Sequence, residues 1–337
     1  MTNRSKLLIS IAFAFLIICI GTSLGSSNIS IYDTVVIILQ KIFNTSIGNN
    51  IDPKNISIVW KLRLPRVLLA FIVGGCLSIS GAVVQSILKN QLASPYTLGV
   101  SSGASLGAGI VIISGLSIPI ISGFTLPIVG FLFGLATVYL VIVFSNKIDK
   151  SMSNNTIILC GMVFSLFVNA LLTTLTALFS NELKAVSLWQ MGSFAMKGWL
   201  YVRLVLPFFI IGTIGVLKYT KEMDILTFGE EQAKSVGVDT QIVKKKLFIF
   251  ASILTGGAVS LSGTIGFVDL IAPHVARKIV GSSHRYVIPM SFIVGGSLMV
   301  ITDLIARTIV SPSELPVGAI TAIIGAPFFA WVYFKKR

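Results

Sequence analysis

Few residues of this chain have the type and spacing that catalysis or metal binding requires. Its two histidines, His274 and His284, lack the spaced Cys, His or carboxylate companions of a metal site. No GxxxxGK[ST] loop is present to hold a nucleotide. The cysteines, Cys19, Cys76 and Cys160, each lie inside an apolar run, which is typical of small packing residues. We therefore expect no catalytic site, metal site, cofactor or ATP site in this chain.

The recognition of carboxylates by arginine fits the chain better. Arg63 and Arg66 flank Leu64-Pro65 where a long apolar run begins, and a guanidinium can hold a carboxylate through two parallel hydrogen bonds. Arg307 follows Asp303 by four residues, one turn along the same helix face. An ion pair within that helix and a partner-facing role for Arg307 are both open, because charges inside a membrane are often functional.

The elements that position these residues are predicted to lie in lipid. Hydrophobic residues make up 54% of the chain and charged residues only 11%, whereas a soluble domain has about 25% charged residues. The mean hydropathy is +0.92. Apolar stretches of about 20 residues, enough to cross a bilayer, recur from Leu7 to Phe334. The sequence therefore predicts an all-α integral membrane protein in which residues 1–337 form a single transmembrane domain.

Apolar runs along the chain predict about ten transmembrane helices. Their approximate bounds are 7–24, 65–88, 96–116, 124–144, 156–179, 199–217, 247–267, 268–280, 286–306 and 315–334. The eighth is too short to span a bilayer, so a half-helix packed against protein is expected there. An even number of spans places both termini on one side, where most of the 26 Lys and Arg then lie. The positive-inside rule makes that side cytoplasmic, and the net charge of +14 indicates topology rather than nucleic-acid binding.

The chain also contains a repeated motif. Residues 74–81 are GGCLSISG and residues 256–263 are GGAVSLSG, so five of eight positions match. The two copies run in opposite directions under the predicted topology, which favours a five-helix inverted repeat with halves at roughly 60–180 and 240–337. Close packing of membrane helices also explains small residues, although it does not require the same order in both halves. Inverted repeats are typical of transporters.

A long polar segment, residues 218–246, is predicted to lie at the inner face. It contains FGEEQAKSVGV at 228–238, where two acids open a short helix and Gly237 closes it. From the residues alone, this helix fits either a solvated connector or a docking element for a cytoplasmic partner.

Several motifs in order resemble the FecCD family of importer permeases along nearly the whole chain. They are RLPR at 63–66, SGAVVQ at 80–85, KNQLASP at 89–95, LGVSSGA at 98–104, FGEEQAKSVGV at 228–238, SLSGTIGFVDLIAPHVAR at 260–277, DLIAR at 303–307 and ELPVGAITAIIGAPFF at 314–329. The family includes cobalamin, haem and ferric-siderophore permeases. The resemblance implies a type II ATP-binding cassette (ABC) importer permease, multi-pass in the bacterial cytoplasmic membrane, that is not itself an enzyme. Implied partners are a second identical or paralogous permease, two cytoplasmic ATPase subunits, an extracellular or periplasmic substrate-binding protein, a metal-chelate cargo and membrane lipid.

The resemblance also implies three sets of site residues. Docking of the binding protein is expected at Arg63, Arg66 and Arg307. Coupling to the ATPase is expected at Phe228, Gly229, Glu230, Glu231, Ala233, Ser235 and Gly237. A cytoplasmic gate is expected at Asn90, Leu92, Asn154 and Asn155. Two positions depart from the family pattern, because Gln91 replaces a common Pro and Asp269 replaces a common Gly.

Cargo and mechanism have alternatives. An iron-siderophore is preferred because it is the commonest cargo of the family, with haem or cobalamin as alternatives. An ion-coupled secondary transporter would also contain an inverted repeat, but it should carry paired acids near mid-membrane, where only Asp269 and Asp303 are candidates. A structural or signalling subunit would have neither the coupling helix nor the arginines.

Overall fold

The computed structural model describes residues 2–25, 29–43, 51–118 and 123–334, which are mostly helical and contain no β-strand. In chain order the α-helices are α1 Asn3–Ser23, α2 Ile31–Phe43, α3 Pro53–Ser57, α4 Leu64–Ile87, α5 Val100–Ser114, α6 Thr125–Ile148, α7 Asn154–Leu178, α8 Leu183–Gln190, α9 Trp199–Lys218, α10 Thr220–Phe228, α11 Glu230–Ser235, α12 Thr240–Ser262, α13 Val268–Val280, α14 His284–Thr308 and α15 Val317–Phe334. A π-helical turn, Ile58–Arg63, joins α3 to α4.

Each of the ten predicted apolar segments contains a helix. Within the described ranges, six helical segments are long and apolar enough to cross a membrane: α1, Pro53–Ile87, α6, α7, α9 and α14. The apolar parts of α5 and α15 are shorter. The membrane-spanning all-α fold is therefore confirmed, while the count of ten spans stays a prediction.

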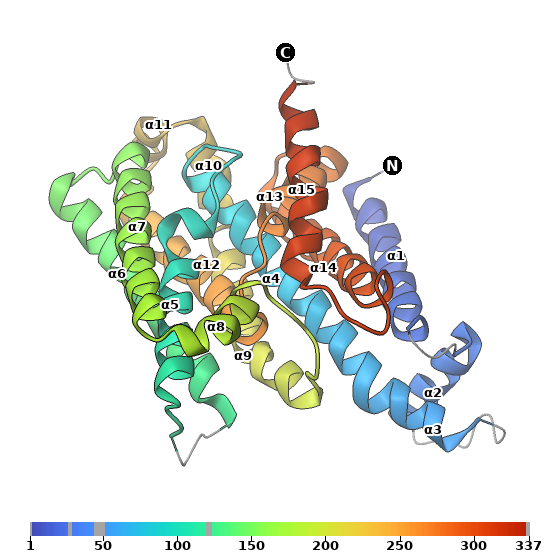
Figure 1. The fold of residues 1–337 in the computed structure, drawn as a ribbon. Helices are drawn as coiled ribbons and strands as arrows, with labels where there is room; N and C mark the ends of the chain where they lie inside the picture. The colour runs from blue at the N-terminus through green and yellow to red at the C-terminus, as the bar shows by residue number, and fades with distance from the viewer. Residues whose placement is uncertain (1, 26–28, 44–50, 119–122, 335–337) are drawn as a thin grey trace.

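The connecting helices gather at two opposite ends of the bundle (Figure 1). The start of α1, the end of α15, and α10 and α11 lie at the upper end of this view. The helices α2 and α3, together with the end of α5 and the start of α6, lie at the lower end. This arrangement agrees with an even number of crossings between α1 and α15, because α1 begins and α15 ends at the same end of the bundle.

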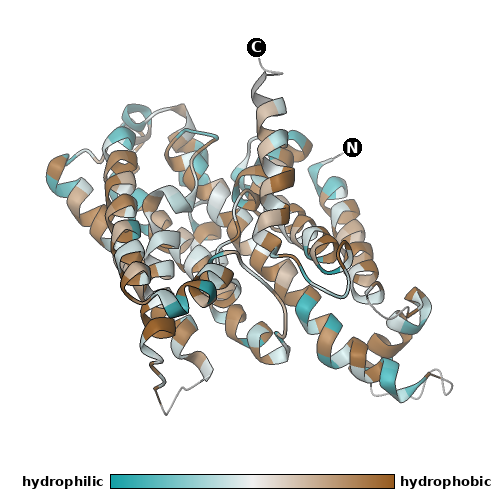
Figure 2. Cartoon of the chain, viewed as in Figure 1, coloured by the Kyte–Doolittle hydropathy of each residue, from teal (hydrophilic) through white to brown (hydrophobic). Residues whose placement is uncertain are grey.

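The centre of the bundle is formed by α4 and its neighbours. The most apolar part of the helical segment Pro53–Ile87, which contains α4, is 83% buried, whereas the most apolar parts of α7 and α9 are 28% buried. Helix α4 therefore packs against protein, while α7 and α9 face outward. It contacts α14, α12, α13 and α9. Apolar residues run along the outward-facing helices, while hydrophilic residues gather near α10 and α11 (Figure 2). A central helix enclosed by apolar helices is the arrangement expected when lipid surrounds the protein.

The two halves pack in corresponding ways. The pairs α5–α6 and α13–α14 are in contact, as are α4–α14 and α12–α6. The repeated motif lies where α4 and α12 cross, and there Thr255 Oγ1 donates to Ser80 Oγ at 2.6 Å. Ser80 in turn donates to the carbonyl oxygen of Ala251 at 2.8 Å. These hydrogen bonds join α4 to α12, whereas glycines of the two copies pack against other helices, Gly74 against α14 and Gly257 against Phe208 of α9. The five-helix inverted repeat therefore stays a prediction.

The predicted half-helix is α13, with 13 residues. It contacts α4, α14 and α15, and most of its side chains are buried. A Cβ atom added to Gly81 of α4 would lie only 1.9 Å from the carbonyl oxygen of Asp269 in the first turn of α13. The start of α13 therefore rests directly on the backbone of α4, and a glycine is required at that contact.

Three helices, α2, α3 and α8, fall outside the predicted segments. They have 13, 5 and 8 residues, too few to cross a bilayer. A search for long apolar runs therefore could not find them.

Candidate functional site

A cluster of charged residues joins the start of α4 to the end of α14. Arg66 donates from Nη2 to Asp303 Oδ1 at 2.8 Å and from Nε to Asp303 Oδ2 at 3.0 Å. Its remaining terminal nitrogen, Nη1, donates to Glu314 Oε1 at 2.8 Å. Asp303 is 1% exposed and Glu314 is 38% exposed. Arg66 thus connects one buried and one solvent-accessible carboxylate.

The other two arginines of the predicted docking set are turned toward α1. Arg63 is 6% exposed and donates to the carbonyl oxygen of Ser23 at 2.5 Å. Arg307 donates to the carbonyl oxygen of Gly21, and its Nε lies 3.8 Å from Asp303 Oδ2. The expected pair within α14 is therefore present, although it is longer than a hydrogen bond. Both guanidinium groups satisfy backbone oxygens at the end of α1.

We call Arg63, Arg66, Asp303, Arg307 and Glu314 the arginine cluster. Three guanidinium groups share two carboxylates, so the cluster carries a net positive charge. Arg66 and Glu314 form its more accessible part. The net positive charge would attract an added carboxylate to this end of the bundle, where Arg66 is 12% exposed and Arg307 is 7% exposed.

The predicted coupling helix is α11, which begins at Glu230 and ends at Ser235 as the sequence indicates. The flanking Gly229 and Gly237 have φ angles of 142° and 86°, which residues with a Cβ rarely adopt. The sharp turns at these glycines project α11 from the bundle at the end where α1 begins and α15 finishes (Figure 1).

The exposed surface of the coupling segment mixes apolar and charged side chains. Phe228 is 79% exposed and Val236 is 66% exposed, whereas Ala233 between them is fully buried. Glu231 and Ser235 are also exposed. Next to α11 lies a groove of about 370 Å³ that is lined by residues 234 and 237–241. Exposed apolar residues rimmed by polar ones are typical of a protein interaction surface.

The expected gate residues lie in two short connections. Asn90 follows α4, and its side-chain oxygen accepts from the amide of Leu92 at 2.9 Å, while the Leu92 side chain is 56% exposed. Asn154 and Asn155 begin α7; Asn155 is exposed, and Asn154 faces the protein. Both connections lie at the same end of the bundle as α11 (Figure 1).

The connection before Asn154 is held in one shape by Asp149. Its carboxylate accepts from the amides of Ser151 and Ser153 at 2.8 and 2.9 Å. Hydrogen bonds from Ser151 and Ser153 lower the pKa of Asp149, so this carboxylate stays ionised at neutral pH. The start of α7 therefore follows a preformed turn.

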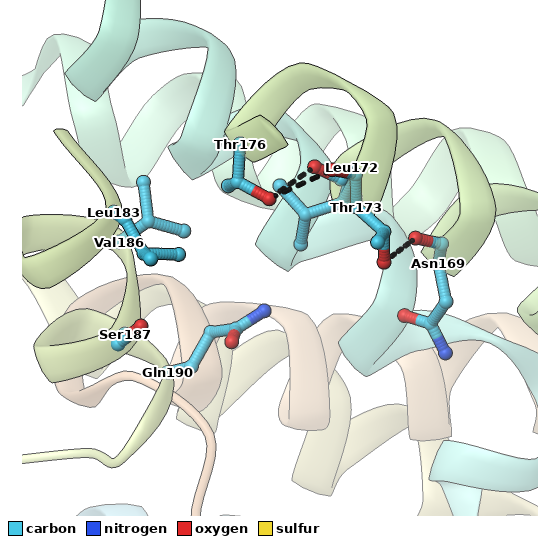
Figure 3. Close-up of a pocket in the computed structure, with 8 residues that line it drawn as sticks. All are labelled: Asn169, Leu172, Thr173, Thr176, Leu183, Val186, Ser187 and Gln190. Atoms are coloured by element: carbon cyan, nitrogen blue, oxygen red, sulfur yellow. Dashed lines mark hydrogen bonds between the residues drawn. The ribbon is translucent and has the colours of Figure 1, made fainter. Parts of the chain in front are cut away.

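A polar hollow of about 160 Å³ lies between α7 and α8. Asn169, Thr173 and Thr176 of α7 lie opposite Ser187 and Gln190 of α8 (Figure 3). Asn169 and Thr173 are exposed, although they belong to a helix long enough to span a membrane. Exposed amide and hydroxyl groups on such a helix favour contact with water or with another protein rather than lipid.

Sequence patterns missed three polar partners. They are Glu314 beside Arg66, Lys244 beside Asn154, and Asp224, whose Oδ1 lies 2.5 Å from Nδ1 of His284. Glu314 lies in the ELPVG motif, but the motif does not indicate that Glu314 pairs with Arg66. The other two join distant segments with no short-range spacing to reveal them.

The two acids considered for ion coupling lie in different environments. Asp303 is held by Arg66 as described, and Asp269 is 2% exposed and accepts a hydrogen bond from Ser94 Oγ. The two residues are on different helices, α14 and α13, and neither has the other as a hydrogen-bond partner. The described residues also contain no group of three or more His, Cys, Asp or Glu that could hold a metal ion.

Comparisons with known proteins agree with these features. Residues 12–335 match the model of the FecCD transport family. The chain is 44% identical over 329 residues to the uncharacterized ABC transporter permease protein YvrB of Bacillus subtilis, covering 97% of this chain and 93% of that protein. It is 32% identical to the hemin transport system permease protein HmuU of Yersinia pestis, covering 96% and 94% of the two chains.

A solved structure is also similar. It is described as an inward-facing conformation of a metal-chelate type ABC transporter, and it has a TM-score of 0.86, 30% identity and coverage of 98% of this chain and 99% of that one. The family match extends over nearly the whole chain, and the relatives are permease subunits rather than enzymes. The protein therefore belongs to the FecCD transport family of ABC importer permeases.

Proposed function

We propose that this chain is the transmembrane subunit of an importer that moves an iron-siderophore or similar metal chelate across the bacterial cytoplasmic membrane. ATP hydrolysed by two partner subunits at α11 drives transport. A binding protein delivers cargo at the arginine cluster, and a second permease, identical or paralogous, completes the path. Both termini are cytoplasmic in this proposal. The observation that carries it is the position of two unlike surfaces, α11 and the arginine cluster, at opposite ends of one membrane bundle (Figure 1).

Cargo class follows from chemistry and from the relatives. The hollow of about 160 Å³ between α7 and α8 is lined by amide and hydroxyl groups and by Leu172, Leu183 and Val186, so it can offer polar contacts to part of a ferric chelate but cannot enclose one. The metal-chelate transporter structure favours a metal chelate, and the hemin permease relative favours haem as the first alternative. Haem and cobalamin are the alternative cargoes, and uptake assays with each compound distinguish them from a ferric siderophore.

The test is uptake by the complete complex in sealed vesicles. Permease, ATPase and binding protein are reconstituted together and offered an iron-55 ferric hydroxamate, haemin or cobalamin in separate assays. We expect accumulation of the ferric hydroxamate only with ATP inside and all subunits present. Accumulation driven by an ion gradient without ATP or ATPase would instead identify a secondary transporter.

Charge reversal in α11 is expected to uncouple ATP hydrolysis from cargo uptake. Glu231 is exposed in the first turn of α11, so Glu231→Lys changes the surface offered to the ATPase without disturbing the core. Uptake should fall about tenfold or more, as for the loss of a charge pair at a docked surface. Uptake, ATP hydrolysis and permease yield are measured together. Lys147→Glu, a charge reversal at an exposed position at the end of α6, is the control. Normal uptake by Glu231→Lys would contradict the coupling assignment.

Gate closure is expected to bring the two connections together across the permease pair. Cysteines introduced as Asn90→Cys and Asn154→Cys should crosslink in at least one nucleotide state and less in another. Lys221→Cys, exposed on α10, replaces Asn90→Cys in a control for random collision. Crosslinking is followed by gel mobility with and without ATP. If no state gives a crosslink above that control, these residues do not form the gate.

A further inference from the structure

Lys244 of α12 lies where three segments of the cytoplasmic end meet. Its side chain is 1% exposed, and Nζ donates to Glu230 Oε1 at 2.5 Å. The same nitrogen donates to Asn154 Oδ1 at 3.1 Å and to the carbonyl oxygen of Met152 at 3.2 Å. These acceptors belong to α11, to the start of α7 and to the connection before it. One ammonium group therefore joins the coupling helix to the expected gate.

Because the Lys244 ammonium is buried, its stability depends on all three hydrogen bonds. An ammonium has three donors, and here each has an acceptor. A buried cation without such partners would be strongly unfavourable, so movement of one acceptor requires the others to follow or the site to open. Lys246, half a turn further along α12, is exposed and lies 5.6 Å from the ring of Tyr219. The buried position of Lys244 is thus specific to this residue of the Lys run.

The segment on the gate side is stiff enough to transmit a displacement. Asp149 fixes the turn through Ser151 and Ser153, as described above. Gln241, one turn before Lys244, donates to the carbonyl oxygen of Lys150 at 2.5 Å. The first turns of α12 therefore hold this connection at two points, and Asn154 follows it directly.

We propose that Lys244 is a positioning residue that transmits the movement of α11 to the cytoplasmic gate through Glu230 on one side and Asn154 on the other. This inference rests on the proposed function, because it takes α11 as the ATPase contact. The Glu230 carboxylate is 28% exposed, so it can move with α11 while it keeps its bond to Lys244. The gate end then responds because the same ammonium holds Asn154 and Met152.

The experiment uses the complete complex in lipid, with a spin label at Asn155→Cys in each permease and the native cysteines replaced. The distance between the two labels is measured with and without ATP, together with ATP hydrolysis and uptake of the ferric hydroxamate. In Lys244→Met we expect hydrolysis to persist, the nucleotide-dependent distance change to disappear, and uptake per ATP to fall about tenfold, as for loss of a charge-assisted hydrogen bond. Lys147→Met, exposed at the end of α6, is the control.

A double-mutant cycle separates transmission from local structure. Asn154→Leu removes the acceptor of Lys244. Uptake per ATP in the double variant Lys244→Met/Asn154→Leu should be no lower than in either single variant, because both substitutions break the same contact. Glu230→Gln provides a second test from the α11 side, with the same direction of change. Independent, multiplying losses in the double variant would overturn the inference.

Other outcomes are also decisive. An unaltered distance change in Lys244→Met would overturn the proposed link while leaving the importer function intact. Failure of Lys244→Met and Glu230→Gln to assemble, with normal assembly of Lys147→Met, would assign Lys244 a purely structural role and overturn it as well. If the parent complex itself shows no ATP-dependent uptake, the proposed function fails rather than this inference.

Discussion

Replacing Arg66 by glutamate is expected to abolish uptake and to reduce the yield of folded permease. The substitution removes the partner of Asp303, which is 1% exposed, and adds a third carboxylate beside Asp303 and Glu314. Breaking a buried ion pair by removing one partner costs about 3–5 kcal/mol, and the added repulsion acts in the same direction. Uptake in vesicles and the thermal unfolding of purified permease measure the two effects.

A neutral pair of substitutions separates folding from docking. Arg66→Met combined with Asp303→Leu removes both charges, and replacement of a buried pair by apolar residues is often neutral for stability. We expect this variant to fold but to bind the substrate-binding protein weakly at low salt. Glu314→Gln, at the exposed side of Arg66, should change stability by less than about 1 kcal/mol. Tight docking by the neutral variant would show that Arg66 serves only the fold.

A charge reversal on the partner supplies the complementary test. If Arg66 meets a glutamate of the binding protein, a Glu→Arg change there should partly restore docking to Arg66→Glu, provided that the permease folds. Arg63→Glu and Arg307→Glu should not be rescued to the same extent, because their guanidinium groups contact the end of α1. The three arginines expected to act together therefore differ in their contacts, because Arg66 binds two carboxylates whereas Arg63 and Arg307 bind carbonyl oxygens at the end of α1.

Gly81→Ala is expected to lower the thermal stability of the permease and its folded yield. The added Cβ would lie 1.9 Å from the carbonyl oxygen of Asp269, so α4 and α13 must move apart. Overpacking of this kind typically costs about 1–3 kcal/mol, and contact with backbone leaves little room to relax. Thermal unfolding in detergent and uptake in vesicles are measured.

Gly266→Ala is the matched control for this clash. Gly266 lies just before α13, and a Cβ added there has no heavy atom within 4 Å, other than those of its chain neighbours. The Gly266→Ala variant should therefore have an unfolding temperature close to that of the parent protein. Equal stability of the two variants would mean that α13 does not rest on α4 as closely as described.

Sequence patterns predicted the elements better than the contacts between them. Hydropathy located the helices, and the length of the segment 268–280 identified α13 as a half-helix, because both properties are local. Helix-end preferences, which are also local, predicted a short helix that opens at the acids Glu230 and Glu231 and closes at Gly237, and α11 is observed at Glu230–Ser235. The amphipathic α2 and the short α8 were missed, since neither forms an apolar run long enough to span a bilayer.

The charged contacts were only partly predictable. Spacing along one helix indicated the Asp303–Arg307 pair, but Asp303 instead forms its hydrogen bonds with Arg66, 237 positions away in the sequence. The guanidinium of Arg66, on the neighbouring helix, aligns with both carboxylate oxygens of Asp303, whereas Nε of Arg307 stays 3.8 Å from Asp303 Oδ2. In the sequence, Lys244 is one of three consecutive lysines, residues 244–246, and no spacing distinguishes it from the other two. Its burial depends on how α11 and α7 fold against α12, which no local pattern contains.

The enclosure of α4 has a consequence for the making of the protein. Synthesis completes α4 before α9, α12, α13 and α14, the helices that surround it, have left the ribosome. During that interval the GGCLSISG face has no helix to pack against, and Arg66 has neither Asp303 nor Glu314. Until α14 and the segment with Glu314 are made, Arg66 therefore remains an arginine without its two carboxylates at the end of an apolar helix, and this end of α4 reaches its final contacts only late in synthesis.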